Sequence, residues 1–558
     1  ANPFVILSPE NTCETSGSCI GCNLIYSGNH YEALEKDSYG KFRFVAGINP
    51  RSFSWQLAPG EVFYTPEAVL NFSADGFRGL SGQLHSFIRE HIVRGVWKHK
   101  PRPVLLNSWE ACYFKIDEKK LLQLAKAGKN AGIELFVMDD GWFLGRNDDT
   151  SSLGDWEPDP KKLPGGIASL SKKIKELGMD FGIWVEPEMI SENSNLYKEH
   201  PDWAMKIPGH PHSEGRNQCI LDLCNPEVRK YVIEEMTRVF SSGEIRYVKW
   251  DMNRIFSDIY APSLPAERQG ETAHRYVLGL YHIMEELTTR FPKILFEGCS
   301  AGGNRFDLGI LCYFPQIWAS DNTDALCRTG IQNSYSYGYP LSVFTAHVSS
   351  CPNHQTLRIT PLETRFQVAS FGILGYECNL KDLSGSDLNA IREQIALYKK
   401  WREVFQFGTF YRGTENEDSD SETLSWTCVS PDGRRAVGLF FRRLTTPNQS
   451  HDWYRPVGLL PDVKYHFYGR NIKYNLKDFG DLVNTVSPVH IKQGSALQEI
   501  LSRFVNMDGE KEDLTAYGDT LMLAGIALKP AFAGTGYNSD TRLFPDFSSR
   551  IYFMEAAE

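Results

Sequence analysis

Apolar residues are arranged differently in three successive stretches of the chain. Residues 1 to about 95 and residues 424 to about 527 carry short apolar runs broken by Gly, Asn and Pro, which is typical of β-sheet domains. From residue 104, strand-length apolar runs alternate with segments whose apolar residues recur at the spacing of one helix face. The charged, proline-containing segment 98–103 separates the first two stretches and predicts a domain boundary.

The middle stretch predicts parallel strand–helix units. Strand-like runs lie at about residues 104–108, 135–139, 181–186, 246–251, 294–298, 316–320, 341–346 and 371–376. Helical patterns lie at about residues 117–131, 166–178, 226–242, 270–290 and 388–404. This alternation favours a (β/α)8 barrel, with a doubly wound open sheet as the alternative. No Gly-x-Gly-x-x-Gly follows an early strand to support the open sheet, but the strand count stays open because Cys219–Asp222 also fits a strand.

The last stretch predicts a further β domain. Two apolar runs, Thr423–Val429 and Arg435–Phe441, flank Ser-Pro-Asp-Gly at residues 430–433, which is a strong hairpin signal. Residues 528–558 show weak periodicity, and we expect them to pack as an arm. We therefore predict three domains, at residues 1–100, 101–422 and 423–558.

Composition and charge limit the kinds of partner. With 59 basic and 69 acidic residues the net charge is -10, which argues against a nucleic-acid or anionic-membrane surface and favours a small neutral ligand. No run of 18 or more apolar residues occurs, so no membrane-spanning helix is expected. The 12 Trp and 25 Tyr suit a site that stacks rings on sugars, although a large aromatic core explains the same composition.

The 12 cysteines are scattered along the chain, and Cys19 with Cys22 forms its single C-x-x-C pair. Because no second pair or His cluster stands at ligand spacing, we expect reduced thiols, no metal and no other cofactor. This cysteine usage favours a cytoplasmic protein. The first residues, Ala1–Phe4, do not form a signal peptide, but we expect the natural start to lie elsewhere, so secretion stays open.

One predicted strand ends in two charged residues. Lys249 and Asp251 are two positions apart, so their side chains point to one side of the strand while Trp250 points to the other. A neighbouring cation lowers the pKa of a carboxylate, which suits a nucleophile. An isolated Lys-x-Asp is nevertheless more often a structural ion pair.

Polar residues end five other predicted strands, where a barrel of this kind carries its active site. They are Trp109–Glu110, Asp139–Trp142, Trp184–Glu188, Glu297 with Cys299, and Trp318 with Ser320 and Asp321. Helix capping or core packing explains each one alone, but six strands together favour a site. Paired carboxylates with aromatic walls favour glycoside cleavage. Phosphate and metal motifs are missing, and Gly298–Gly302 resembles a nucleophile elbow that lacks an assignable His base.

Six motifs resemble, in order, the bacterial and fungal α-galactosidases of glycoside hydrolase family 36. They are Phe136–Phe143, Leu153–Trp156, Gly182–Met189, Ser213–Gln218, Tyr247–Arg254 and Pro315–Asp324, and the resemblance runs from about residue 5 to beyond 520. It implies a partial N-terminal β-supersandwich, a central (β/α)8 TIM barrel and a C-terminal antiparallel β-sandwich. It also implies a retaining exo-enzyme that releases terminal α-galactosyl residues from oligosaccharides of the melibiose and raffinose type.

The same motifs imply roles for individual residues. Asp251 falls on the family nucleophile, Asp321 on the acid/base, and Asp139 with Asp140 on the pair that binds the galactose 4- and 6-hydroxyls. Other matching substrate-binding positions are Trp109, Trp184, Arg216, Lys249, Asn253, Cys299 and Trp318. The two catalytic carboxyls of a retaining enzyme lie about 5–5.5 Å apart. Tetrameric members of the family imply a homo-oligomer.

Two departures from the family pattern matter. The chain begins inside the family's N-terminal domain, so we expect most of the supersandwich to be absent and leave the assembly open. Gly298 stands where many members have Asn, and we expect it to leave room beside the 2-position of the sugar. The nearest alternative is therefore an α-N-acetylgalactosaminidase or α-galactosaminidase. An alternative from another class is a carbohydrate-binding or assembly protein without useful turnover.

Overall fold

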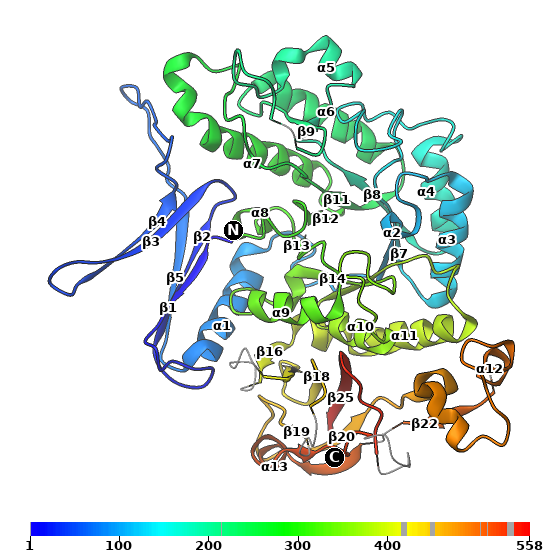
Figure 1. The fold of residues 1–558 in the computed structure, drawn as a ribbon. Coiled ribbons are helices and arrows are strands. Elements are labelled where there is room, and N and C mark those ends of the chain that lie inside the picture. Colours follow the sequence, from blue (N-terminus) through cyan, green and yellow to red (C-terminus); the bar gives the residue numbers. More distant parts are fainter. Residues whose placement is uncertain are drawn as a thin grey trace. The chain divides into compact units, whose positions relative to one another are not determined.

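The computed structural model describes residues 2–213, 215–413, 421–446, 452–502, 504–509, 512–532 and 541–557. The chain forms two compact units. The first contains residues 1–358, 369–383 and 391–400, and the second contains residues 359–368, 384–390 and 401–558. Figure 1 shows the elements of both units coloured by sequence. Within the described residues, every helix is too short or too polar to cross a membrane.

Eight parallel strands close into a barrel in the first unit, which confirms the predicted fold. In order around the barrel they are β6 (Leu105–Asn107), β7 (Leu135–Met138), β8 (Asp180–Val185), β11 (Ile245–Trp250), β12 (Leu295–Gly298), β13 (Gln316–Trp318), β14 (Phe344–Ser349) and β15 (Ile373–Glu377). Because β15 pairs with β6, the ring is closed and the doubly wound open sheet is excluded. The strands are buried on both faces, which explains their continuous apolar runs.

Helices connect the barrel strands and follow the last of them. They are α2 (Trp109–Cys112), α3 (Glu118–Ala131), α4 (Gly166–Glu176), α5 (Asn195–Glu199), α6 (Pro226–Ser241), α7 (Thr272–Arg290), α8 (Leu308–Leu311), α9 (Ala325–Tyr335), α10 (Leu362–Ser370) and α11 (Gly385–Phe407), with 3-10 turns at Pro201–Trp203, Ala266–Glu271 and Leu341–Val343. Asp324 begins α9 by accepting a hydrogen bond from the backbone N–H of Cys327. This cap fixes the end of the loop that carries Asp321.

Two predicted strands differ from the prediction in position or pairing. The seventh strand, predicted at 341–346, begins only at Phe344, because Pro340 starts a 3-10 turn before it. The segment 219–222 does contain a strand, β10 (Cys219–Ile220), but it pairs with β9 (Met189–Ile190) outside the barrel.

The N-terminal strands belong to the same unit as the barrel. β1 (Phe4–Leu7), β2 (Cys19–Ile25) and β5 (Glu67–Ser73) form one sheet, while β3 (His30–Lys36) and β4 (Phe42–Ile48) form a long twisted hairpin (Figure 1). The strand β5 is followed by α1 (Gly76–Phe87) and a π-helical turn, Ile88–Ile92. Ser27 attaches the sheet to the barrel by donating its hydroxyl to Asp307 over 2.6 Å.

The second unit is built on a six-stranded antiparallel sheet. Its order is β16 (Thr409–Arg412), β17 (Thr423–Val429), β18 (Arg435–Arg442), β25 (Ser548–Ala556), β20 (Lys464–Gly469) and β23 (Asp513–Tyr517). The predicted hairpin is confirmed as β17 and β18. The arm predicted at 528–558 is wrong, because β25 is the buried strand between β18 and β20. Residues 533–540 of that segment lie outside the described part of the chain.

Smaller elements complete the second unit. They are β19 (Trp453–Tyr454) with β24 (Ile526–Ala527), β21 (Lys473–Asn475) with β22 (Asn506–Asp508), α12 (Ala496–Leu501), α13 (Gly518–Leu523) and a 3-10 segment at Leu476–Thr485. The division of the chain after residues 100 and 422 stays a prediction.

Candidate active site

Polar side chains gather in one cavity where the barrel strands end. The cavity has a volume of about 170 Å³. The residues to which the family resemblance gives a role all line it: Trp109, Asp139, Asp140, Trp184, Arg216, Lys249, Asp251, Asn253, Cys299, Trp318 and Asp321. Four other residues predicted at the strand ends are not among the described residues that line it: Trp142, Glu188, Glu297 and Ser320. Five further residues line it as well: Glu110, Thr323, His354, Gln355 and Glu377. The structure thus brings the predicted residues together, while the role of each stays a prediction.

Asp251 follows the last residue of β11 and is held from several sides. One of its carboxylate oxygens, Oδ2, accepts hydrogen bonds from the Trp184 indole at 3.1 Å and the Asn253 side-chain amide at 2.8 Å. Its backbone N–H continues the strand pairing by donating to the carbonyl of Val185 at 2.8 Å. The carboxylate therefore has a fixed position and is only 6% exposed.

The surroundings of Asp251 favour its ionised form. Burial raises the pKa of this carboxyl, but the ammonium of Lys249 and hydrogen bonds from Cys299, Asn253 and Trp184 outweigh burial and lower the pKa below its usual range. Lys249 acts on Asp251 through its field, because its hydrogen bond goes to Asp139, at 3.1 Å. An ionised carboxylate with a lowered pKa is suited to act as a nucleophile.

Asp321 follows β13 in the opposite electrostatic environment. Burial and the negative charge of Asp251 raise the pKa of its carboxyl, and Lys249 and a hydrogen bond from Trp318 offset only part of this rise. The Trp318 indole donates to Oδ1 of Asp321 at 2.8 Å and so orients the group. A raised pKa lets a carboxyl hold its proton to higher pH, which suits a general acid. Two carboxyls in one cavity therefore have pKa values pushed apart, which separates an acid from a nucleophile.

Asp139 and Asp140 present acceptors at the end of β7. Asp139 accepts from the Asn107 amide at 2.7 Å and from Lys249. Asp140 forms a buried ion pair with Arg146, whose Nη2 lies 2.8 Å from Oδ2. Because carboxylate oxygens accept hydrogen bonds, this pair is suited to bind two hydroxyl groups of one ligand.

Arg216 comes from a loop rather than from a barrel strand. Its backbone φ is 53°, and that of Asn217 is also 53°, so two successive residues adopt the left-handed region without being glycine. Arg254, buried at the end of β11, holds this loop by donating to the carbonyls of Ser213 at 3.0 Å and Gln218 at 3.2 Å. The conformation that brings Arg216 to the cavity is therefore maintained by a buried side chain of the segment that follows β11.

Two carboxylate–histidine pairs at the cavity were not predicted as site residues. Glu110 lies 3.0 Å from Nδ1 of His354, and Glu377 lies 2.8 Å from Nδ1 of His347. Glu377 is the last residue of β15, so reading the ends of all eight predicted strands, instead of the first six, would have found it. His354, Gln355 and Thr323 lie on loops, where the period of the strands carries no information.

A further buried carboxyl lies directly behind Asp251. Glu186 accepts hydrogen bonds from the Gln218 side-chain amide at 2.6 Å and the Asn253 backbone N–H at 2.5 Å. Burial and the charge of Asp251 raise the pKa of Glu186 to about 8. Glu186 does not line the cavity, but it fixes Asn253, which in turn binds Asp251.

Gly298 does not face the cavity, and the expectation that it leaves room beside a sugar is wrong. It pairs with Trp250 across β12 and β11, on the side of the strands away from Asp251. A Cβ atom at this position would lie 3.0 Å from Cγ2 of Ile310 and 3.6 Å from Cδ2 of Phe314. The space beside Gly298 therefore belongs to the apolar layer behind the barrel. The neighbouring Cys299 is hydrogen-bonded to Asp251, so the resemblance of this segment to a nucleophile elbow does not extend to a histidine partner.

Family models cover most of the chain. The model described as Melibiase matches residues 62–408. The models described as the N-terminal and C-terminal domains of glycosyl hydrolase family 36 match residues 1–58 and 423–554.

Curated relatives and solved structures agree with these matches. Alpha-galactosidase AgaA of Geobacillus stearothermophilus is 46% identical over 471 residues, covering 84% of this chain and 64% of the relative. Alpha-galactosidase Mel36A of Lactobacillus acidophilus is 47% identical over 464 residues, covering 83% of this chain and 63% of the relative. The chain thus spans less than two thirds of the length of these relatives. The crystal structure of AgaA has a TM-score of 0.87 at 41% identity and covers 100% of this chain and 70% of that chain. A variant of AgaA has been solved in complex with raffinose, with the same TM-score of 0.87.

Proposed function

The chain belongs to glycoside hydrolase family 36, the melibiase family, and from this premise we propose that it is a retaining α-galactosidase. The substrates would be oligosaccharides with a terminal α-galactosyl residue, of the kind represented by the raffinose bound to AgaA. The observation that carries the proposal is the pair Asp251 and Asp321. They share one cavity, and their surroundings lower the pKa of the first carboxyl and raise the pKa of the second.

Two carboxyls in these states fit a double displacement. Asp251 attacks the anomeric carbon, while Asp321 gives its proton to the departing glycosidic oxygen, so that the C–O bond breaks and a galactosyl ester forms on Asp251. In the second step a water molecule attacks the same carbon, Asp321 takes the water's proton, and galactose leaves with its original configuration. The Trp184 and Asn253 donors and the field of Lys249 hold Asp251 ionised before attack.

Sugar selection falls to the carboxylates at the end of β7. Galactose differs from glucose in its axial 4-hydroxyl, and Asp139 with Asp140 offers acceptors for the 4- and 6-hydroxyls. Because Arg146 and Lys249 each bind one of these carboxylates, both are held rigidly toward one sugar geometry. Arg216, Cys299, Trp109 and Trp318 would complete the contacts around the ring.

A direct assay tests the proposal. Purified protein is given an aryl α-galactoside, the matching α-glucoside and the matching 2-acetamido-2-deoxy-α-galactoside, and kcat/KM is measured for each. We expect turnover of the first to exceed the others by at least about a hundredfold. No turnover of any substrate, together with measurable galactose binding, would favour the carbohydrate-binding alternative. Preference for the 2-acetamido sugar would favour the alternative of an α-N-acetylgalactosaminidase. The position of Gly298 does not support that alternative, because Gly298 does not face the cavity.

We propose two further properties of the protein. In the part of the chain that the structure describes, none of the twelve cysteines forms a disulfide bond, which supports a reducing, cytoplasmic environment. The N-terminal sheet exposes apolar side chains, among them Leu70 at 66% and Phe72 at 59% exposure, which supports a homo-oligomer through this sheet. Gel filtration with light scattering tests the second property.

A further inference from the structure

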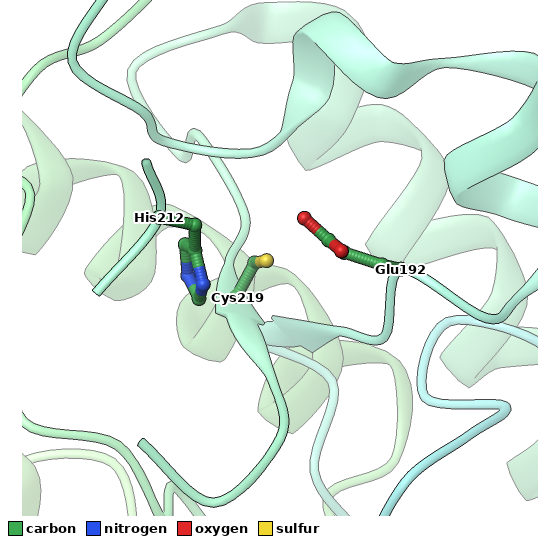
Figure 2. Close-up of side chains that lie close together, drawn as sticks. All are labelled: Glu192, His212 and Cys219. Atoms are coloured by element: carbon green, nitrogen blue, oxygen red, sulfur yellow. The ribbon is translucent and has the colours of Figure 1, made fainter. Parts of the chain in front are cut away.

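Three side chains with metal-binding atoms converge outside the cavity. They are Glu192, His212 and Cys219, which reach one point from separate stretches of the chain (Figure 2). A carboxylate oxygen, a ring nitrogen and the Sγ atom all lie within 4.8 Å of one another. Three atoms that close lie within about 2.8 Å of a common point (4.8 Å divided by √3), whereas zinc takes sulfur at about 2.3 Å and nitrogen or oxygen at about 2.0–2.2 Å. Inward shifts of less than about 1 Å would therefore bring all three to coordination distance of one ion.

Two of these groups lie at the short strands β9 and β10. Cys219 pairs with Ile190 across these antiparallel strands. Glu192 stands two residues beyond Ile190, in the bend that follows β9. The thiol is buried and the carboxylate is exposed.

Neighbouring hydrogen bonds position the third group. Ser213, which follows His212, donates its backbone N–H to Asp258 at 3.1 Å and its hydroxyl to the same carboxylate at 2.5 Å. Nε2 of His212 lies 3.9 Å from Oδ2 of Asp258. The carboxylate of Asp258 therefore lies beside the ring and holds the segment that carries it.

The donor atoms of the cluster suit a metal cation. A dication at this point would compensate the carboxylate and displace the thiol proton, as it does at other thiolate sites. A sulfur, nitrogen and oxygen donor set suits Zn²⁺, whereas Mg²⁺ and Ca²⁺ prefer oxygen ligands alone.

We propose that Glu192, His212 and Cys219 bind one Zn²⁺ ion, with water as the fourth ligand on the exposed side. The ion would join the loop that carries His212 to strands β9 and β10. The same loop continues to Arg216, which lines the cavity, so zinc would fix the segment that brings Arg216 into place. The site stands independently of the proposed hydrolase activity, because its ligands are separate from the residues of the cavity.

Metal affinity tests the proposal directly. Protein freed of metal by a chelator is titrated with zinc in competition with a chromogenic chelator. We expect one tightly bound ion per chain and a loss of affinity of at least about a hundredfold in Glu192→Gln and in Cys219→Ser. Cys13→Ser is the matched control, because Cys13 is a partly exposed thiol in the loop before β2. This control should bind zinc as the unmodified protein does.

Two other readouts separate the site from other thiols. Titration with Co²⁺ should produce a thiolate-to-cobalt charge-transfer band in the near-ultraviolet, which Cys219→Ser removes and Cys13→Ser keeps. Zinc should also slow tryptic cleavage after the exposed Lys206, at the start of the loop, in the unmodified protein but not in Glu192→Gln. Because Glu192 is exposed, its variant should fold normally, which circular dichroism checks. The proposal would be overturned if Glu192→Gln kept the full zinc affinity. It would also be overturned if the unmodified protein bound zinc no more tightly than Cys219→Ser does.

Discussion

The backbone N–H of Asn253 donates to the side chain of Glu186 over 2.5 Å, and the side-chain amide of Asn253 donates to Asp251 over 2.8 Å. A carboxyl after β8 therefore positions a carboxyl after β11 through one intermediate residue. The two carboxyls also oppose each other electrostatically, because the charge of Asp251 raises the pKa of Glu186.

Glu186 makes the stability of the fold depend on pH. Its pKa is about 8 in the folded protein against an ordinary value of 4.5, so the folded state prefers the protonated form. Its stabilising contribution is complete below about pH 4.5 and is lost as the pH rises through about 8. The side chain of Gln in Glu186→Gln is neutral at every pH. The free energy of unfolding of this variant, relative to that of the unmodified protein, should therefore be higher at pH 9 than at pH 5. Urea unfolding at both pH values measures this, and parallel profiles would contradict it.

Replacing Asp251 tests the nucleophile. Asp251→Ala should lower kcat on an activated aryl galactoside by at least about a thousandfold, because the covalent step has no substitute. The fold should persist, since the change removes a carboxylate and leaves the strand pairing of its backbone. Added azide should occupy the vacated face and give the β-galactosyl azide. A loss of less than about tenfold, which is only about 1.4 kcal/mol, would show that Asp251 is not the nucleophile.

Replacing Asp321 should give a different signature. An acid matters most when the leaving group is poor, so Asp321→Ala should impair hydrolysis of a natural disaccharide far more than that of a nitrophenyl galactoside. Azide should then attack the galactosyl ester on Asp251 and give the α-galactosyl azide. The alkaline limb of the pH profile, which reports loss of the Asp321 proton, should disappear with the side chain. Equal losses on both substrates would instead indicate a binding role.

Gly298 should affect stability and leave sugar selection unchanged. A Cβ atom at this position meets Ile310 at 3.0 Å, so Gly298→Ala should lower the free energy of unfolding by about 1–3 kcal/mol through overpacking. The ratio of kcat/KM for the galactoside to that for the 2-acetamido sugar should stay within about twofold. Thermal unfolding and the two assays check this, and a selective change in the ratio would place residue 298 beside the substrate after all.

Strand alternation could have predicted the orientation of Gly298. Glu297 and Cys299 were predicted to share one side of their strand, and a strand that turns these two to one side turns the residue between them to the other. The barrel, its strand order and the cavity-lining residues at its strand ends were all predictable in this way. They depend on apolar periodicity and on the shared direction of parallel strands.

Other features could not be predicted because they depend on contacts between distant residues. The pairing of Lys249 with Asp139 joins residues 110 positions apart and needs the closed ring to bring them together. His354 reaches the cavity from a loop without a periodic signal. The three metal-binding side chains stand at positions 192, 212 and 219, a spacing that matches no familiar ligand motif.

The place of β25 in the C-terminal sheet has a consequence for biosynthesis. Its neighbours β18 (Arg435–Arg442) and β20 (Lys464–Gly469) are translated well before it, and until residues 548–556 leave the ribosome each exposes an unpaired edge. The sheet is therefore completed only after nearly all of its own chain has been made, which leaves the nascent domain open to intermolecular strand pairing during that interval. Loss of residues 548–556 would leave β18 and β20 without their shared partner and should prevent the sheet from closing.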